Sequence, residues 1–245
     1  MKILKSMIAS LAAAAMLFTL CACGGSAGST AASSAAPAAS GGSAAAAPKV
    51  MTLRIAHGAS ESYHMSRAME EFKKVAEGSG LFKVELYPNQ TFGADPEMIE
   101  GVMTGDLDMA VVPTSYLTDY APSIALIELP YVFPSRAAAI ETLKGDWAKQ
   151  QMALLEESGL HAFGYLENGI RNITNSKKEI HLPADMSGMK MRTMAVEAHV
   201  KYWNSLGCSA EGSAFSELYT NLSTGVYDGQ ENPIAHIYAN KFYEV

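Results

Sequence analysis

The chain has very little cysteine. Only three of its 245 residues are cysteines, and Cys21 and Cys23 both lie near the N-terminus, so Cys208 is the single thiol of the remaining chain. One thiol cannot form an internal disulfide bond, so stability has to come from a hydrophobic core. A cysteine-based metal site is excluded for the same reason.

Runs of basic residues are also lacking. The chain has 18 Lys and Arg residues against 25 Asp and Glu residues, which gives a formal net charge of −7. No stretch could neutralise a row of phosphates and release their counterions, so a nucleic-acid partner is excluded. The acidity itself is typical of a soluble protein.

The motifs of common enzyme chemistry are missing. There is no nucleophile elbow, phosphate loop, dinucleotide-binding fingerprint or paired-histidine metal motif. The six histidines are scattered, and His181, His199 and His236 lie in polar or surface-like contexts, so most are expected to be surface or packing residues. The sequence therefore predicts no catalytic residue, no cofactor and no bound metal. A secreted α/β enzyme is one alternative hypothesis. Chemical turnover of the bound ligand would distinguish such an enzyme from a binding protein.

The N-terminus has the pattern of a secretory signal. Lys2 and Lys5 precede an apolar run over residues 7–18. The run leads into Leu20-Cys-Ala-Cys-Gly24, where a small residue precedes Cys23 and a leucine stands three positions upstream, which resembles the bacterial lipobox. We expect residues 1–22 to be removed and Cys23 to be lipidated; Cys21 fits less well because Leu20 precedes it. An unmodified secreted protein is the alternative, and a single membrane-spanning anchor suits the short apolar run less well.

A tract of small residues follows this cysteine. Residues 24–48 are almost wholly Ala, Ser and Gly, with too few bulky side chains to offset the entropy of ordering. Residues 23–49 are therefore predicted to be a flexible tether between a membrane anchor and a folded part that begins near Val50. This arrangement places the protein outside the cytoplasm, in a periplasm or on the outer face of the cytoplasmic membrane.

Strand and helix patterns alternate at the start of the folded part. Asp95 and Pro96 are typical of an N-cap and of the first residue of a helix. The segments with a strand pattern are 51–56, 82–87 and 107–112, and those with a helical pattern are 63–77 and 95–104. Such alternation predicts a mainly parallel sheet covered on both faces. Because ligands of these folds bind at the carboxyl ends of strands, the loops 57–63, 88–94 and 113–116 are candidate binding loops.

A second α/β set follows a helical stretch over residues 136–158. Its strand patterns cover 160–166, 170–175 and 188–194, and its helical stripes cover 196–206 and 215–222. The predicted fold class is therefore α/β, with two lobes and a ligand cleft between them. Lobe I is expected over residues 50–167 and lobe II over residues 168–245. The chain stops inside a helical pattern without a closing Gly, Asn or Pro, so lobe II is expected to be incomplete.

Three polar residues are candidates for ligand recognition. Arg171 and Arg192 each lie in a strand-like run, and a guanidinium can hold a carboxylate through two parallel hydrogen bonds. The alternative, that both arginines are solvated or paired with nearby acids, is the commoner situation for arginine. Asn232 precedes Pro233, which restricts it to an extended conformation, and either recognition or helix capping would suit it.

The motifs taken together resemble those of the DctP-type solute receptors of TRAP transporters, the tripartite ATP-independent periplasmic family. The resemblance covers essentially everything after the tether. Its motifs are the opening strand with His57, Tyr87-Pro-Asn-Gln-Thr-Phe-Gly93 leading into Glu97 and Gly105-Asp-Leu-Asp-Met-Ala110, Leu129-Pro-Tyr-Val-Phe133, Gly169-Ile-Arg-Asn-Ile-Thr174, Leu182-Pro-Ala-Asp-Met-Ser-Gly-Met-Lys-Met-Arg192, and the long segment from Glu217 to Pro233.

The resemblance implies a clamshell that closes on a small organic acid, a C4-dicarboxylate or a related carboxylate, and delivers it to the subunits of an ion-gradient-driven membrane permease. It makes Arg192 the principal clamp on the carboxylate, with support from Arg171 and a hydrogen bond from Asn232. Further contacts are implied for Gln90, Phe92 and Glu97 of lobe I and for Phe215 of lobe II. The runner-up is a type-2 binding protein of another importer or of a signalling receptor, which neighbouring genes would distinguish.

Overall fold

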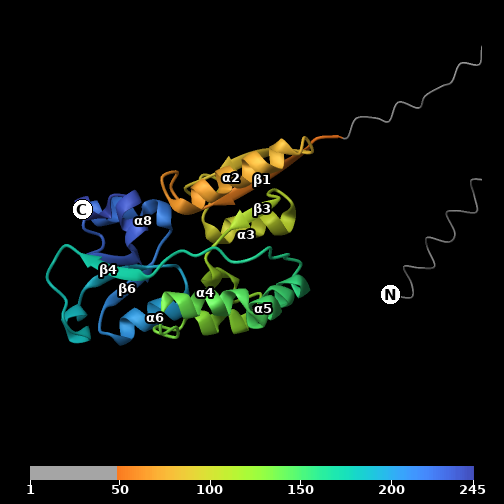
Figure 1. The fold of residues 1–245 in the computed structure, drawn as a ribbon. Coiled ribbons are helices and arrows are strands. Elements are labelled where there is room, and N and C mark those ends of the chain that lie inside the picture. Colours follow the sequence, from red (N-terminus) through yellow and green to blue (C-terminus); the bar gives the residue numbers. More distant parts are fainter. Residues whose placement is uncertain (1–48) are drawn as a thin grey trace, which may run out of the picture. The chain divides into compact units, whose positions relative to one another are not determined.

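The structure is a computed structural model that describes residues 49–245 (Figure 1). The predicted signal peptide, the predicted lipidation site Cys23 and nearly all of the predicted tether lie outside the described residues. None of the helices within 49–245 combines the length and the apolar character that a bilayer span requires.

The N-terminal sheet has three parallel strands. β1 (Met51–His57) lies between β2 (Phe82–Tyr87) and β3 (Met109–Val111). Helix α2 (His64–Gly78) connects β1 to β2, and α3 (Asp95–Thr104) connects β2 to β3. These five elements confirm the predicted alternation, although β3 is shorter than the segment 107–112. The carboxyl ends of all three strands therefore lie at one edge of this sheet.

The start of α3 differs from the prediction. Ala94 is the N-cap, and Asp95 is already the first helical residue. The Ala94 N–H donates to the carboxylate of Glu97. The Asp95 side chain instead accepts a 2.8 Å hydrogen bond from Gln90 Nε2 inside the protein. Asp95 does not cap the helix because its carboxylate is buried and directed toward Gln90.

Helical segments connect the N-terminal sheet to the second one. They are the 3₁₀ turns η1 (Thr114–Leu117) and η2 (Pro122–Glu128) and the helices α4 (Arg136–Lys144) and α5 (Asp146–Glu157). The predicted single stretch 136–158 is thus two helices, divided at Gly145, whose backbone is extended. A buried cluster packs α3 against η2, α5 and the residues beside them: Ile99, Ala121, Ile124, Leu155 and Leu160.

The predicted strand over residues 160–166 is wrong. This segment has no regular structure, and Phe163 is 77% exposed. Apolar alternation favours an extended chain, but a strand also needs a neighbour with which to exchange hydrogen bonds. No strand among residues 49–245 pairs with it.

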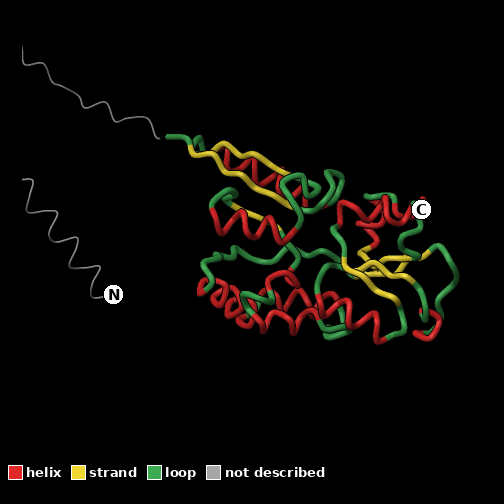
Figure 2. Tube along the Cα trace, turned by 180° about the vertical axis from the view of Figure 1, so that it is seen from behind, coloured by secondary structure: helices red, strands yellow, loops and turns green. Residues whose placement is uncertain are grey.

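The C-terminal sheet has the order β4-β7-β5-β6 and is separate from the N-terminal sheet (Figure 2). Strands β5 (Lys190–Thr193), β6 (Ser209–Gly212) and β7 (Gly229–Pro233) are parallel, whereas β4 (Arg171–Asn175) is antiparallel to β7. The remaining elements are η3 (Pro183–Met186), α6 (Glu197–Ser205), η4 (Phe215–Glu217), α7 (Leu218–Ser223), α8 (Ile234–Ala239) and η5 (Phe242–Glu244). The lobe boundary predicted at residue 168 lies between the two sheets and stays a prediction.

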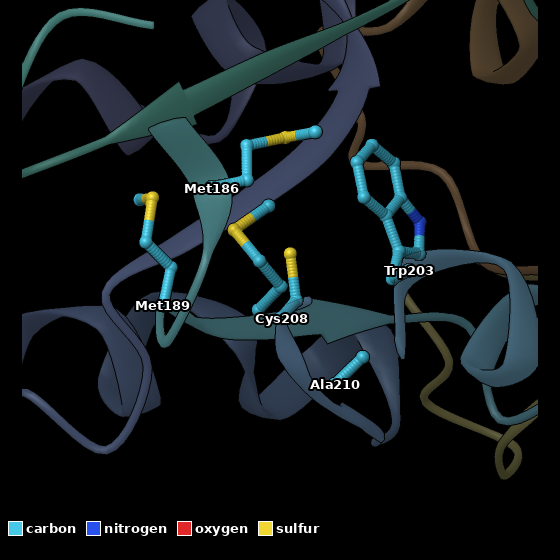
Figure 3. Close-up of a cluster of buried hydrophobic side chains, with 6 residues drawn as sticks. Met186, Met189, Trp203, Cys208 and Ala210 are labelled. Atoms are coloured by element: carbon cyan, nitrogen blue, oxygen red, sulfur yellow. The ribbon is translucent and has the colours of Figure 1, made fainter. Parts of the chain in front are cut away.

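A sulfur-rich core stabilises the C-terminal sheet. The side chains of Met186, Met189 and Cys208 converge with the ring of Trp203 (Figure 3). Cys208 is a free, buried thiol, and burial raises its pKa. This cluster confirms that apolar packing, and not a disulfide bond, stabilises the region, as expected for a segment with one cysteine.

The sequence did not predict β7. Its residues Gly-Gln-Glu-Asn-Pro form a turn-like pattern, yet all five are buried. The polar side chains bond to one another and to β4: Gln230 Nε2 donates to Thr174 Oγ1 at 2.7 Å, and Asn232 Nδ2 donates to Gln230 Oε1 at 2.6 Å. Hydrogen-bond partners replace hydrophobicity in this strand, so an apolar pattern is not needed.

Candidate functional site

A cavity of about 1270 Å³ contacts both sheets. From the N-terminal sheet, the loops after β1, β2 and β3 contribute Gly58, Gln90 and Ser115. From the C-terminal part, Arg192 and Asn232 contribute. The three loops predicted from the carboxyl ends of the strands thus do line one cavity, together with both predicted arginines.

Arg192, on β5, is a buried cation without a carboxylate partner. Its side chain is 2% exposed, and its Nη2 donates to the backbone oxygen of Ser213. Its Nε has no hydrogen-bond partner, and no ion pair with N···O within 4.0 Å among residues 49–245 includes it. Burial lowers the pKa of its guanidinium, which reflects the cost of holding a charge away from water. An unpaired buried cation at a cavity has the chemistry to pair with an anion.

Phe215 lies against this guanidinium. The ring centroid is 6.0 Å from Arg192 Cζ, at the outer limit of a cation–π contact, and both residues line the cavity. Two residues that the resemblance implies as ligand contacts thus lie beside each other at the cavity.

Arg171, on β4, is in a different state. Its Nε donates to the carboxylate of Glu231, and its Nη2 donates to the Glu231 backbone oxygen at 2.7 Å and to Asn232 Oδ1 at 3.3 Å. Pairing with a nearby acid, the alternative left open for both arginines, thus describes Arg171 and not Arg192. Arg171 also orients the Asn232 amide, which lines the cavity. Helix α8 has Pro233 as its N-cap without a side-chain capping bond, so the capping alternative for Asn232 is excluded.

Gln90 connects the two halves of the cavity. Its amide donates to Asp95, and its Oε1 accepts a 2.9 Å hydrogen bond from the backbone N–H of Ser216. The backbone of Gln90 has a φ of +57°, a left-handed conformation that costs a non-glycine residue energy. The loop after β2 is therefore held in a strained form that brings this amide into the cavity.

Asp95 is a buried acid that the sequence analysis did not assign to the site. Burial raises the pKa of its carboxyl to about 6, although the hydrogen bond from Gln90 and the charge of Arg192 act in the opposite direction. It lines the cavity beside Gln90. Its only sequence signal is its position after a candidate binding loop, where the pattern predicts a helix cap.

Phe92 and Glu97 do not line the cavity. The Phe92 ring packs edge-on against Tyr87, with centroids 6.0 Å apart, and lies so close to Gly101 that a Cβ there would be 2.9 Å from the ring. Glu97 accepts the N-cap N–H of α3, as described above. The structure gives both residues a packing or capping role in place of the predicted ligand contact.

His236, on α8, has a polar or surface-like sequence context, but the structure makes it a buried packing residue. Its ring stacks on Tyr63 with centroids 3.7 Å apart, and its Nε2 lies 2.9 Å from Asn168 Oδ1. Burial and the charges of Arg171 and His64 lower the pKa of His236 to about 3, so the ring is neutral. His236 lines the cavity, and its position four residues after Asn232 is the available sequence signal.

Comparison with known proteins agrees with this geometry. The family model described as bacterial extracellular solute-binding protein, family 7 (DctP), matches residues 55–245. The solute-binding protein RD1_1052 of Roseobacter denitrificans is 36% identical over 200 residues, which are 80% of this chain and 60% of that protein.

Two solved structures are similar in fold. The sugar acid binding protein DctPAm of Advenella mimigardefordensis has a TM-score of 0.78 and 32% identity, and the match covers 81% of this chain and 64% of that one. A TRAP periplasmic solute binding protein of Sulfurospirillum deleyianum has a TM-score of 0.76 and 28% identity, over 79% and 63%. The chain spans about three fifths of the length of the Roseobacter protein and of a similar solute-binding protein of Verminephrobacter eiseniae. The chain therefore belongs to family 7 of the bacterial extracellular solute-binding proteins, the DctP family.

Proposed function

We propose that the protein is an extracytoplasmic receptor that captures a small carboxylate and delivers it to a TRAP-type membrane permease. The observation that carries this proposal is the buried guanidinium of Arg192, which faces the cavity without a carboxylate partner among residues 49–245. The relatives support it: the Advenella protein was solved with galactonate and the Sulfurospirillum protein with succinate.

Closure of the two predicted lobes would strengthen this ion pair. A charge pair gains more attraction when water is excluded, so the carboxylate would be held most tightly in the closed form. The ligand then shifts an open–closed equilibrium by its difference in affinity for the two states. The permease would recognise the closed receptor.

In this proposal Arg192 is the clamp and Arg171 a positioning residue. The guanidinium of Arg171 is already bonded to Glu231 and holds the Asn232 amide at the cavity, so its contribution is to orient Asn232 and to add positive potential. Phe215 and Gln90 shape the wall beside Arg192.

A thermal-shift screen of the purified full chain against a panel of organic acids tests the proposal. One or more acids should raise the melting temperature of the wild-type protein and should have no effect on Arg192→Ala, because truncating one partner of a charge-assisted pair costs about 2–5 kcal/mol. Arg171→Ala should weaken binding less. Retained affinity in Arg192→Ala would exclude the clamp.

We further propose that Cys23 carries the lipid anchor. Metabolic labelling with an alkyne fatty acid should mark the wild-type protein and Cys21→Ser but not Cys23→Ser, and Cys23→Ser should leave the membrane fraction. Labelling of Cys23→Ser would contradict the assignment.

A further inference from the structure

The cavity holds a buried acid and a buried cation that do not form an ion pair. Asp95 is 6% exposed and Arg192 is 2% exposed, and both residues line the cavity. Among residues 49–245, neither takes part in an ion pair with N···O within 4.0 Å. A buried charge without a partner costs free energy, so the protonation of this acid should respond to any charge that enters the cavity.

A short series of contacts connects the acid to the wall that carries the cation. Asp95 accepts a 2.8 Å hydrogen bond from Gln90 Nε2, and Gln90 Oε1 accepts a 2.9 Å bond from the Ser216 N–H. Ser216 follows Phe215, whose ring centroid is 6.0 Å from Arg192 Cζ. The Gln90 amide is neutral, so it connects the two walls without offsetting either charge.

Two groups from other elements act electrostatically on the Asp95 carboxyl or are affected by it. Burial raises the pKa of Asp95 to about 6, although the hydrogen bond from Gln90 and the charge of Arg192, on β5, lower it. Burial and the charge of Asp95 raise the pKa of Tyr116, on η1, so this hydroxyl stays neutral and contributes no charge. Asp95 is therefore mostly ionised at pH 7 in the empty cavity, and Arg192 is the cation that favours its ionised form.

Most other titratable groups that line the cavity already have partners or stay neutral. Asp108 and Arg171 each form an ion pair with a residue of opposite charge. Burial raises the pKa of Tyr165 and lowers that of His236, so both rings are neutral at pH 7. Burial alone would raise the pKa of Glu128, but hydrogen bonds to neighbouring side chains outweigh it and lower the pKa. The remaining group is His161, whose side chain is exposed and bonded to Glu156.

A carboxylate bound at Arg192 would change the electrostatic potential at Asp95. It would offset the positive charge that favours the ionised form of Asp95, and it would add a second negative charge to the same buried site. Two carboxylates that share such a site do not both stay ionised at neutral pH. Charges interact over several ångströms where water is excluded, so this effect needs no contact between Asp95 and the ligand. Arg192 keeps the ligand ionised, which leaves Asp95 as the group that accepts a proton.

We propose that the capture of a carboxylate at Arg192 is coupled to the uptake of one proton by Asp95. The inference rests on the proposed carboxylate-receptor function and adds a form of regulation to it. The receptor binds its ligand more tightly as the surroundings become more acidic, and release of the ligand returns the proton.

Isothermal titration calorimetry of the wild-type full chain counts the proton. The probes are galactonate, galacturonate, erythronate and succinate, each titrated at pH 7 in buffers that differ in ionisation enthalpy. The change of the binding enthalpy with the buffer enthalpy gives the number of protons exchanged. The wild-type protein should take up about half a proton or more per bound ligand, and its affinity should fall about tenfold between pH 6 and pH 8.

Two variants assign the proton to a residue. Asp95→Asn retains an oxygen that can accept the Gln90 amide but does not titrate, so it should take up no proton and its affinity should not change between pH 6 and pH 8. His161→Gln removes the exposed histidine that also lines the cavity. This control should take up the same number of protons as wild type.

The outcomes separate this inference from the function on which it rests. Binding heats of the wild-type protein that do not depend on the buffer would overturn the coupling, and this count needs no variant. Proton uptake that persists in Asp95→Asn would also overturn it, and both results leave the carboxylate receptor intact. Failure of all four acids to bind at any pH from 6 to 8 would contradict the receptor function itself.

Discussion

The side-chain oxygen of Gln90 accepts a 2.9 Å hydrogen bond from the backbone N–H of Ser216 and thereby links the loop after β2 to η4. The same amide donates to the buried carboxylate of Asp95. One side chain thus connects the two walls of the cavity, and the positive φ of Gln90 shows that the loop is held against its backbone preference.

Removing this link should weaken ligand binding. Gln90→Ala loses the bond to Ser216, so the arrangement in which the two cavity walls are linked becomes less favourable, and the affinity for the bound acid should fall about 3- to 10-fold. Thr91→Ala is the control, because that hydroxyl bonds only to the local Pro88 carbonyl. Calorimetric titration measures both. Equal affinities in the two variants would show that the link does not contribute to binding.

Arg192→Met should separate stability from function. The variant removes a buried charge that has no carboxylate partner, so the free energy of unfolding without ligand should be unchanged or higher by about 1 kcal/mol, while acid binding is lost. Urea unfolding with and without the acid measures both effects. Arg54→Met, which breaks an exposed pair with Asp108, should retain binding and lose less than about 1 kcal/mol. A large loss of stability in Arg192→Met would contradict the unpaired state.

Asp95 should make stability depend on pH. Its pKa is about 6 in the folded protein and 3.8 in the reference state, so its favourable contribution is complete below pH 4 and is lost as the pH rises through 6. The unfolding free energy of wild type relative to Asp95→Asn should fall by on the order of 3 kcal/mol between pH 4 and 8. Thermal unfolding of both proteins across this range gives the difference. A difference that does not change with pH would contradict the raised pKa.

Gly229, the first residue of β7, should not tolerate a side chain. A Cβ there would lie 2.6 Å from the Thr174 backbone oxygen and 2.9 Å from Met191 Sδ. Gly229→Ala should therefore lower the free energy of unfolding by about 1–3 kcal/mol or prevent folding. Gly78, at the end of α2, has nothing within 4 Å of the same position, and Gly78→Ala should be neutral or stabilising by up to about 1 kcal/mol. Chemical denaturation of both variants checks the contrast.

Local pattern predicted the elements that have one apolar face. The alternation in residues 51–56 and 82–87 and the helical stripe in 63–77 predict elements that are present as β1, β2 and α2. The stripe of α2 is not buried, since Phe72 is 37% and Val75 is 76% exposed. Alternation in residues 160–166 favours a strand, but a local pattern does not show whether a neighbouring strand is available. No strand among residues 49–245 pairs with this segment.

The arginines in strand-like runs are candidates for an anion site, but the residue types alone favour solvated or paired arginines. The family resemblance is what selects Arg192 as the clamp.

The sequence alone determined the α/β class and the family resemblance, and it predicts the exported, tethered organisation that we propose, since all of these depend on residue order and spacing. Only the tertiary structure decided which arginine is free. Arg171 and Arg192 look alike in the chain, but antiparallel pairing places Arg171 beside the β7 strand that carries Glu231, whereas Arg192 has a backbone carbonyl and a cavity. The same holds for His236 and β7, whose burial depends on hydrogen bonds to residues more than fifty positions away, which no local pattern records.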